Sequence, residues 1–397
     1  MTVYINRIGT AKPDHEISGA FITWAERQLT EPRDIVLLRR MAARSGIDKR
    51  WSVLPVAPGG GSPIDTGGFY SGATLPTTSV RMAAYAKEAP NLALDAVAQL
   101  GELGNVTHLV VASCTGFTAP GIDQIIANRL GLAGSIERTL VGFMGCYAAV
   151  AALRVANHIV RSTRGARVLL VTVELPTLHL QPDTALEPIL AQMLWSDGAA
   201  AALVSAEPRG LALGSFFAAT LPDSQELMRW TIGDMGFAMH LSGDVPRRIA
   251  QAVAHDDALK SEIGLPEVID GWAIHAGGRS VLDAVESGLH LAPDALRHSR
   301  RMLAENGNMS SSTIMFVLAA MMEEGAPQHG LAIAFGPGLA AEGFHFRKPV
   351  KSSSRPSPAK RRKSRLSRLA DHFVQPRDHD PELAHSHVVP RRTPSGR

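Results

Sequence analysis

The chain has 397 residues, 45% hydrophobic and 19% charged, which is ample for a large core in one big domain or two coupled halves. It contains only two cysteines, which excludes a disulfide framework and favours a reducing compartment. The net charge of +3 is unevenly placed, because residues 347–397 hold 14 of the 40 basic but only 4 of the 37 acidic residues. Residues 1–346 therefore carry a net charge of −7, and the basic balance says nothing about an active site.

The chain begins "MTVYINRIGTAKPDHE", which lacks the basic and then apolar pattern of a signal peptide. No stretch reaches about 18 uninterrupted apolar residues, so we expect no transmembrane helix. These features predict a cytoplasmic protein.

Strand-like and helix-like segments alternate along the body of the chain. Residues 51–80 are rich in Gly and Pro and are expected to be irregular. Short apolar runs predict buried strands at 107–113, 167–174, 199–205, 272–276 and 330–336. Amphipathic patterns predict helices at 92–100, 121–130, 148–160 and 294–307, the last ending on Gly307. This alternation is typical of an α/β fold with layered sheets.

The C-terminal segment 347–397 is rich in Ser, Pro and Arg and has few apolar side chains. Such a composition does not bury enough surface to offset the entropy of ordering, so we predict a disordered basic tail. Its basic run could contact nucleic acid or an acidic surface. A solvated tail without a nucleic-acid partner is the favoured interpretation.

Cys146 lies in "GFMGCYAAVAALRVA", where a glycine-rich loop meets a predicted buried helix. A free cysteine often acts only as a small buried hydrophobe. At the N-terminus of a helix, however, unsatisfied N–H groups and the helix dipole favour the thiolate, which can attack a thioester carbonyl. The flanking residues do not form a G-x-S-x-G elbow, and the lack of a second cysteine at ligand spacing excludes a zinc site.

Two further polar residues occupy places where apolar ones are expected. His275 ends the predicted strand "WAIHAGG", and Asn308 lies in "ENGNMSSSTIMFVL" between a helix stop and another apolar helix. Taken singly, each is explained by a structural role, as a buried histidine with a partner or as a capping asparagine. Their combination with Cys146 favours a catalytic role.

Six motifs appear together in residues 1–346: "VASCTGFTAPGID", "GFMGCYAA", "LWSDGAAAALV", "AIHAGG", "LAENGNMSS" and "AFGPGLAAE". In this order and spacing the chain resembles the type III polyketide synthases, the chalcone-synthase-like branch of the thiolase-fold condensing enzymes. The resemblance implies a thiolase-like αβαβα layered fold of two similar halves, 1–210 and 211–346, followed by the tail 347–397.

The resemblance also implies a mechanism. The family's catalytic Cys, His and Asn fall on Cys146, His275 and Asn308. Cys146, as a thiolate beside an imidazolium, would take an acyl group from coenzyme A. His275 and Asn308 would hold the enolate formed when malonyl-CoA loses CO2, and that enolate would extend the chain by two carbons. Neither a metal nor a redox cofactor is implied.

Other family positions are implied to shape the substrate cavity. Trp195 and Met239 stand where the family has two gatekeeper phenylalanines, and Ala119 replaces a methionine that reaches into the partner's cavity in plant relatives. Cys114 resembles bacterial members, in some of which this cysteine influences the product; a packed structural thiol is the alternative. Gly336, Pro337 and Gly338 resemble the loop that shapes the cyclisation cavity. The flexible Met239 and the small Ala119 favour an aliphatic starter and alkylpyrone- or alkylresorcinol-type products.

The segment "LLRRMAARSG" resembles the basic helix that grips the phosphates of coenzyme A. Arg40 and Arg44 match two cationic positions and share one helix face through their i,i+4 spacing. Leu37 occupies the third position, so Arg39 is suggested to compensate. The resemblance further implies a homodimer, in which the apolar helix after Cys146 could pack against its mate.

Two rival interpretations remain open from the sequence. A ketoacyl-carrier-protein synthase III would share the fold and the three catalytic residues but perform one condensation on a carrier-protein substrate. A non-catalytic acyl-binding or nucleic-acid-binding scaffold would instead depend on the basic tail. The starter acyl group, the number of extensions and the ring closure, to a pyrone or to a resorcinol- or phloroglucinol-type product, are not determined by these motifs.

Overall fold

The computed structural model describes residues 1–349, except 59–61, 66, 72–73 and 265. Its strands are β1 (Val3–Ala11), β2 (His15–Glu16), β3 (Trp51–Ser52), β4 (His108–Ser113), β5 (Glu137–Gly142), β6 (Arg167–Glu174), β7 (Gly198–Ser205), β8 (Leu211–Thr220), β9 (Met228–Gly233), β10 (Gly236–Leu241), β11 (Gly271–Ile274), β12 (Gly330–Gly336) and β13 (Ala340–Arg347). Its helices are α1 (Ser18–Gln28), α2 (Pro32–Arg44), α3 (Thr78–Ala98), α4 (Ile122–Arg129), α5 (Ala148–Ser162), α6 (Leu186–Gln192), α7 (Val245–His255), α8 (Asp257–Ile263), α9 (Arg279–Gly288), α10 (Arg297–Asn306) and α11 (Ser312–Glu324). The disordered tail was predicted for 347–397, but Arg347 is the last residue of β13, so this boundary was one residue too early. The remaining prediction falls on residues 350–397, which lie outside the described part.

Nine strands form one mixed sheet in the order β11-β12-β13-β8-β1-β7-β6-β4-β5. The strand order is similar on the two sides of β1 and β8. β1 is followed outward by β7, β6 and β4, and β8 by β13, β12 and β11, with the inner pairs antiparallel and the outer pairs parallel. The halves are joined by three residue pairs between β1 and β8. The chain is therefore built from two similar α/β halves.

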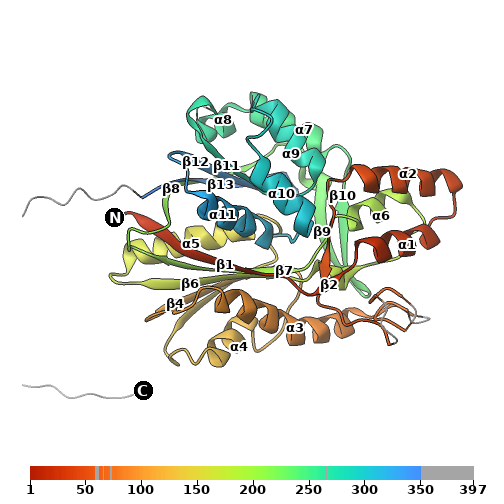
Figure 1. Cartoon of the computed structure of the whole chain (residues 1–397), viewed down its shortest axis with the longest axis horizontal. Helices are drawn as coiled ribbons and strands as arrows, with labels where there is room; N and C mark the ends of the chain where they lie inside the picture. The colour runs from red at the N-terminus through yellow and green to blue at the C-terminus, as the bar shows by residue number, and fades with distance from the viewer. Residues whose placement is uncertain (59–61, 66, 72–73, 265, 350–397) are drawn as a thin grey trace, which may run out of the picture. The chain divides into compact units, whose positions relative to one another are not determined.

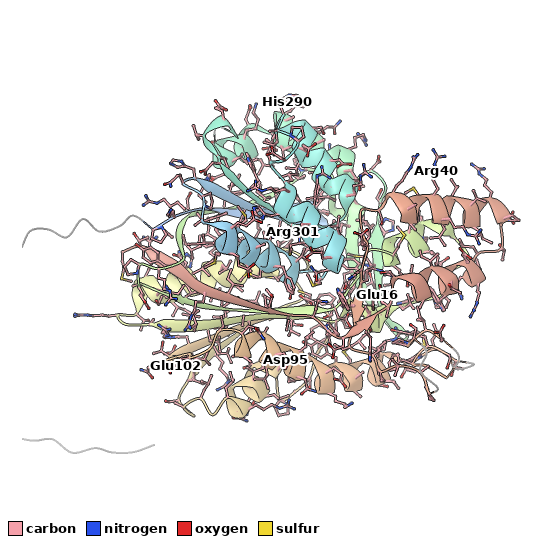
Figure 2. All side chains as sticks on the ribbon, in the orientation of Figure 1. Glu16, Arg40, Asp95, Glu102, His290 and Arg301 are labelled. Atoms are coloured by element: carbon pink, nitrogen blue, oxygen red, sulfur yellow. The ribbon has the colours of Figure 1, made fainter. Side chains whose placement is uncertain are left out.

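The helices divide into three layers around these strands (Figure 1). α5 and α11 lie in the middle and pack against strands of both halves. α3 and α4 cover the outer face of the N-terminal half, while α7, α9 and α10 cover that of the C-terminal half. This is the αβαβα arrangement expected from the sequence. Charged side chains such as Asp95 on α3 and Arg40 on α2 lie on the outer surface (Figure 2).

The predicted buried strands and most predicted helices are present. The runs 167–174 and 330–336 coincide with β6 and β12, whose residues are buried apart from the first of β6. The predicted helix 92–100 is the end of the longer α3, which includes Pro90. α10 stops at Gly307, whose φ of +66° favours glycine. The mostly exposed edge strand β5 has no continuous apolar run and was not predicted.

The apolar helix α5 was identified as one that could pack against a second copy of the chain. Most of its apolar residues are buried in the chain's own central layer, so its composition does not by itself point to a partner. A helix between two sheet layers needs apolar residues on nearly all sides, which explains its composition. Among the described helices, none combines the length and the apolar character needed to cross a membrane.

Candidate active site

Cys146 lies in the turn between β5 and α5, two residues before the first residue of the helix. Gly145 before it has φ of +79°, and a Cβ there would stand 2.2 Å from Cδ of Pro337. Glycine is therefore required for this turn to approach the loop after β12. The side chain of Cys146 is buried, and Ser310 Oγ donates to Sγ at 3.8 Å.

Burial strongly affects the Cys146 thiol. It raises the pKa of this thiol to about 12, and the hydrogen bond from Ser310 offsets only part of this rise. Desolvation therefore acts against the helix-end effect expected from the sequence, which favours the thiolate.

His275 directly follows β11, and its backbone N–H donates to the carbonyl of Ile333 on β12. The residue is 1% exposed, and neither ring nitrogen has a hydrogen-bond partner among the described residues. Burial lowers the pKa of His275 to about 3, which disfavours the imidazolium predicted beside Cys146. An unpaired buried imidazole is costly unless a ligand completes its bonding.

Asn308 lies between α10 and α11 and is held at several points. Its Nδ2 donates to the Gly277 carbonyl at 3.0 Å, and its Oδ1 accepts from the Ser310 backbone N–H at 2.9 Å. Its own backbone N–H donates to the Leu194 carbonyl at 2.8 Å. The second N–H of the amide has no acceptor among the described residues.

These contacts bring the three predicted residues to one region of the fold. Ser310 contacts both Cys146 and Asn308, and Asn308 binds the carbonyl of Gly277, two residues after His275. His275 follows β11, and β12 lies beside β11 in the sheet. Gly336 is the last residue of β12, and a Cβ placed on it would be 3.3 Å from the backbone nitrogen of Cys146. The site thus lies at the C-terminal ends of the neighbouring strands β11 and β12.

Glu174, at the end of β6, is a buried acid near both cysteines that the sequence analysis did not single out. Its carboxylate accepts hydrogen bonds from the Cys114 backbone N–H and from the hydroxyls of Thr115 and Ser311. Burial raises the pKa of Glu174 to about 7. It ties β6 to the Cys114 segment and to the start of α11, beside the Cys146 turn. An acidic residue ending an otherwise apolar strand was the signal in the sequence.

A cavity of about 210 Å³ surrounds Cys146. Its lining includes five residues predicted from the sequence: Cys114, Trp195, Met239, Pro337 and Gly338. Gly336 is buried beside it, whereas Ala119 is exposed on the surface and does not line it. Cys114 Sγ accepts a hydrogen bond from the Gly145 N–H at 3.0 Å, and burial raises the pKa of the Cys114 thiol.

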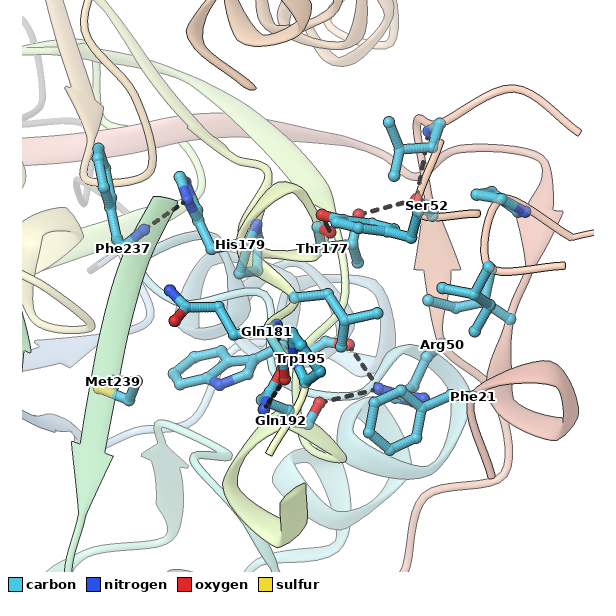
Figure 3. Close-up of a pocket in the computed structure, with 18 of the residues that line it drawn as sticks. Phe21, Arg50, Ser52, Thr177, His179, Gln181, Gln192, Trp195, Phe237 and Met239 are labelled. Atoms are coloured by element: carbon cyan, nitrogen blue, oxygen red, sulfur yellow. Dashed lines mark hydrogen bonds between the residues drawn. The ribbon is translucent and has the colours of Figure 1, made fainter. Parts of the chain in front are cut away.

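A second chamber, also of about 210 Å³, adjoins the first, and Figure 3 shows the residues that line it. The two cavities share the lining residues Pro176, Trp195, Trp230 and Met239. Trp230 and Met239 are cross-strand partners on the hairpin of β9 and β10, and the Trp195 and Trp230 rings meet edge to face at 6.0 Å. These side chains form a partition between the cavities. Trp230 was missed because nothing in the sequence sets it apart from a core tryptophan.

The polar groups around this second chamber are largely bonded to the protein. His179 is bonded to the Thr115 carbonyl and to the Phe237 N–H, and its pKa is lowered to about 3 by burial. Gln192 exchanges hydrogen bonds with the backbone of Gln181, and Arg50 donates to the carbonyls of Gln192 and Trp195 (Figure 3). The remaining lining is mostly apolar, including Phe21, Leu54, Ile64 and Leu180.

A third cavity, of about 420 Å³, opens between α2, α6 and the start of α9. Arg44 lines it, and it extends to Gly277, the carbonyl of which is bound by Asn308. Arg40 projects from the outer side of α2 (Figure 2). Arg39 does not compensate for Leu37 in this cavity: it forms a two-point ion pair with Glu26 of α1, because its side chain faces that helix.

Comparison with known proteins agrees with this architecture. Residues 7–208 match the N-terminal domain, and residues 213–349 the C-terminal domain, of chalcone and stilbene synthases. Type III polyketide synthase C of Arabidopsis thaliana is 34% identical over 260 residues, 61% of this chain and 68% of that protein. Type III polyketide synthase 21 of Oryza sativa subsp. japonica is 34% identical over 269 residues, 63% of this chain and 69% of that protein.

Solved structures are similar over a larger share of the chain. PKS-I from the brown alga Ectocarpus siliculosus superposes with a TM-score of 0.78 at 28% identity, covering 87% of this chain and 98% of that one. The C-terminal type III polyketide synthase domain of Steely1 from Dictyostelium has the same fold, with a TM-score of 0.78 at 23% identity, covering 88% and 100%. The chain belongs to the chalcone and stilbene synthase family, the type III polyketide synthases, and is a CoA-dependent acyltransferase.

Proposed function

We propose that Cys146 carries the acyl group and that His275 and Asn308 hold the negative charge formed on malonyl-CoA. The observation that carries this proposal is the linked set of buried groups: Ser310 contacts Cys146 and Asn308, and Asn308 binds the carbonyl beside His275. The ring of His275 and the second N–H of Asn308 have no hydrogen-bond partners among the described residues. We propose that a bound substrate supplies these partners.

Loading begins when the Cys146 thiol passes its proton to the neutral His275 ring and the sulfur attacks the acyl carbonyl of an acyl-CoA. The bond from the acyl carbon to the CoA sulfur breaks, and the released thiolate takes the proton back from His275. Burial raises the pKa of Cys146 and lowers that of His275, so it disfavours the charged pair, and we propose that the bound substrate favours proton transfer between them.

Extension uses the same donors on malonyl-CoA. As CO2 leaves, the thioester oxygen becomes an enolate oxygen that accepts hydrogen bonds from His275 and Asn308. The enolate carbon then attacks the acyl carbonyl of the Cys146 thioester, and the bond from that carbon to Cys146 Sγ breaks. The acyl chain, now two carbons longer, is left on coenzyme A, and it returns to Cys146 by the loading step before the next extension. One such preorganised donor contributes about 3–4 kcal/mol in related sites. Repetition, followed by ring closure in the Cys146 cavity, yields a pyrone or a resorcinol- or phloroglucinol-type product.

The second chamber supports an aliphatic starter. It is reached past the partition of Trp195, Trp230 and Met239, and its lining is mostly apolar. Because most of its polar side chains are bonded to the protein, an alkyl chain would leave few of them unpaired. An aliphatic tail in this chamber would leave the Cys146 cavity for the growing polyketide. Met239, with its flexible side chain, is proposed to admit the tail.

The remaining roles concern coenzyme A and a second copy of the chain. Arg40 and Arg44 are proposed to bind the CoA phosphates at the mouth of the third cavity. A homodimer is proposed on the exposed apolar side chains of Phe117, Leu140 and Phe143, which are 46%, 48% and 38% exposed. Phe143 also lines the Cys146 cavity, so a partner on this face would lie beside the site. A monomeric mass by light scattering at micromolar concentration would contradict the dimer.

The test combines intact-protein mass with product analysis. Wild type, Cys146→Ala and the matched control Cys114→Ala, the other thiol of the same cavity, are treated with dodecanoyl-CoA. An acyl adduct is expected on wild type and on the control but not on Cys146→Ala. Adding malonyl-CoA should give products that grow by successive two-carbon units. An adduct on Cys146→Ala at the wild-type level, or a single extension only, would refute the proposal.

A further inference from the structure

The outer face of α2 has an unusual composition for this chain. Arg33, Val36, Arg40, Ala43 and Arg44 are spaced by about three or four residues, share one face of the helix and are exposed. Over its length, Pro32–Arg44, the helix has four arginines and one acidic residue, Asp34. Residues 1–346 as a whole have a net charge of −7. This face is therefore a basic patch on an acidic body.

The same face also exposes apolar side chains. Val36 is 64% exposed, and Met41, next to Arg40, is 48% exposed. The phosphates of coenzyme A account for arginines at this place, but not for an exposed valine among them. Apolar side chains surrounded by basic ones are the composition expected of a surface that binds an acidic protein.

The patch is continuous with the route to the active site. Met41 and Arg44 of α2 line the third cavity, which extends to Gly277. The Gly277 carbonyl accepts the hydrogen bond from Asn308. Across the mouth, Arg279 donates to the Arg44 carbonyl and forms an ion pair with Asp283 at 3.5 Å. A thioester on a flexible arm that enters here would arrive beside Asn308.

We propose that the outer face of α2 docks an acidic acyl carrier protein, which delivers the starter to Cys146 on its phosphopantetheine arm. This inference rests on the proposed loading of Cys146. In the transfer, a bond forms between the acyl carbon and Cys146 Sγ, and the bond from the acyl carbon to the phosphopantetheine sulfur breaks. The proton that leaves Cys146 ends on the released phosphopantetheine thiol. Coenzyme A ends in the same arm, so one cavity serves both donors.

Charge complementarity favours this partner over a neutral one, and the arm explains why the patch adjoins the cavity. Nucleic acid or an anionic membrane would also be attracted to Arg33, Arg40 and Arg44, but neither presents a thioester. Binding of such a polyanion to the patch, without acylation of Cys146 by a carrier protein, would refute the proposal.

The experiment compares two acyl donors on the full-length protein. Acylation of Cys146 is followed by intact mass, with dodecanoyl-CoA or with an acidic bacterial acyl carrier protein bearing dodecanoyl-phosphopantetheine. The variants are Val36→Glu and Arg33→Glu, which leave the proposed CoA residues in place. Val268→Glu is the matched control, because Val268 is 55% exposed but lies near β11, outside α2.

We expect the carrier protein to acylate wild type, and each α2 variant to lower that rate by about tenfold or more. The rate with dodecanoyl-CoA should change by less than about twofold, and Val268→Glu should resemble wild type with both donors. Raising the ionic strength from about 0.05 to 0.5 M should slow only the carrier reaction strongly.

Three results would overturn the inference. These are no acylation from the carrier protein, an equal loss with both donors in the α2 variants, or an equal loss in the Val268 control. If dodecanoyl-CoA also fails to acylate wild type, the proposed loading of Cys146 is refuted instead, so the two failures are distinguishable.

Discussion

Asn308→Ala tests the proposed enolate site most directly. The substitution removes the amide N–H that has no acceptor among the described residues, together with the bonds to the Gly277 carbonyl and the Ser310 N–H, and it leaves the Cys146 and His275 side chains unchanged. Because Asn308 is 2% exposed, bulk water does not replace the lost donor freely. Loss of one donor of this kind costs about 3–4 kcal/mol of transition-state stabilisation, or roughly 100- to 1000-fold in the rate of decarboxylation. Acylation of Cys146 by dodecanoyl-CoA should fall far less.

The assay follows CO2 release from malonyl-CoA and, in parallel, the acyl adduct by intact mass. The matched control is Asn306→Ala, two residues earlier, where a buried amide donates to the Met302 carbonyl within α10. That variant should lose stability but keep its turnover per folded molecule. The reasoning is refuted if Asn308→Ala decarboxylates malonyl-CoA within about threefold of wild type. It is also refuted if loading and decarboxylation fall together.

Three other outcomes are expected. Met239→Phe should lower kcat/KM for dodecanoyl-CoA more than for acetyl-CoA, because a rigid ring narrows the partition; equal effects on both would count against the aliphatic chamber. Without substrate, the rate at which iodoacetamide alkylates Cys146 should keep rising as the pH increases above 9, because burial raises the pKa of this thiol to about 12. A rate that reaches a plateau near pH 7 would contradict this expectation. Arg154→Met should lower the free energy of unfolding by about 1–3 kcal/mol, because it leaves the Glu342 carboxylate, 10% exposed, without its ion-pair partner at 2.8 Å. Arg229→Met, which breaks an exposed ion pair with Glu226, should change it little. Equal losses of stability in thermal unfolding would contradict a role for the Arg154–Glu342 pair.

The sequence by itself determined much of the architecture. The apolar runs at 167–174 and 330–336 have the length of a buried strand and are too short for a typical helix. Both fold as strands with these bounds. The six motifs identified the family, which the two matching domain models confirm. They also predicted Cys146, His275 and Asn308, which the fold brings to the ends of adjoining strands. Local patterns and motif order carry this information because they are written in neighbouring residues.

The tertiary structure decided the burial of the reactive groups and the shape of the cavities. A thiolate and an imidazolium were expected, whereas burial among segments distant in sequence raises the pKa of Cys146 and lowers that of His275, which acts against both charged forms. Arg39 was assigned to coenzyme A, yet it pairs with Glu26, 13 residues earlier, because α1 packs beside it. Trp230 gains its place in the partition from pairing with Met239. Desolvation and cavity walls depend on which distant segments meet, and no single stretch of sequence contains that information.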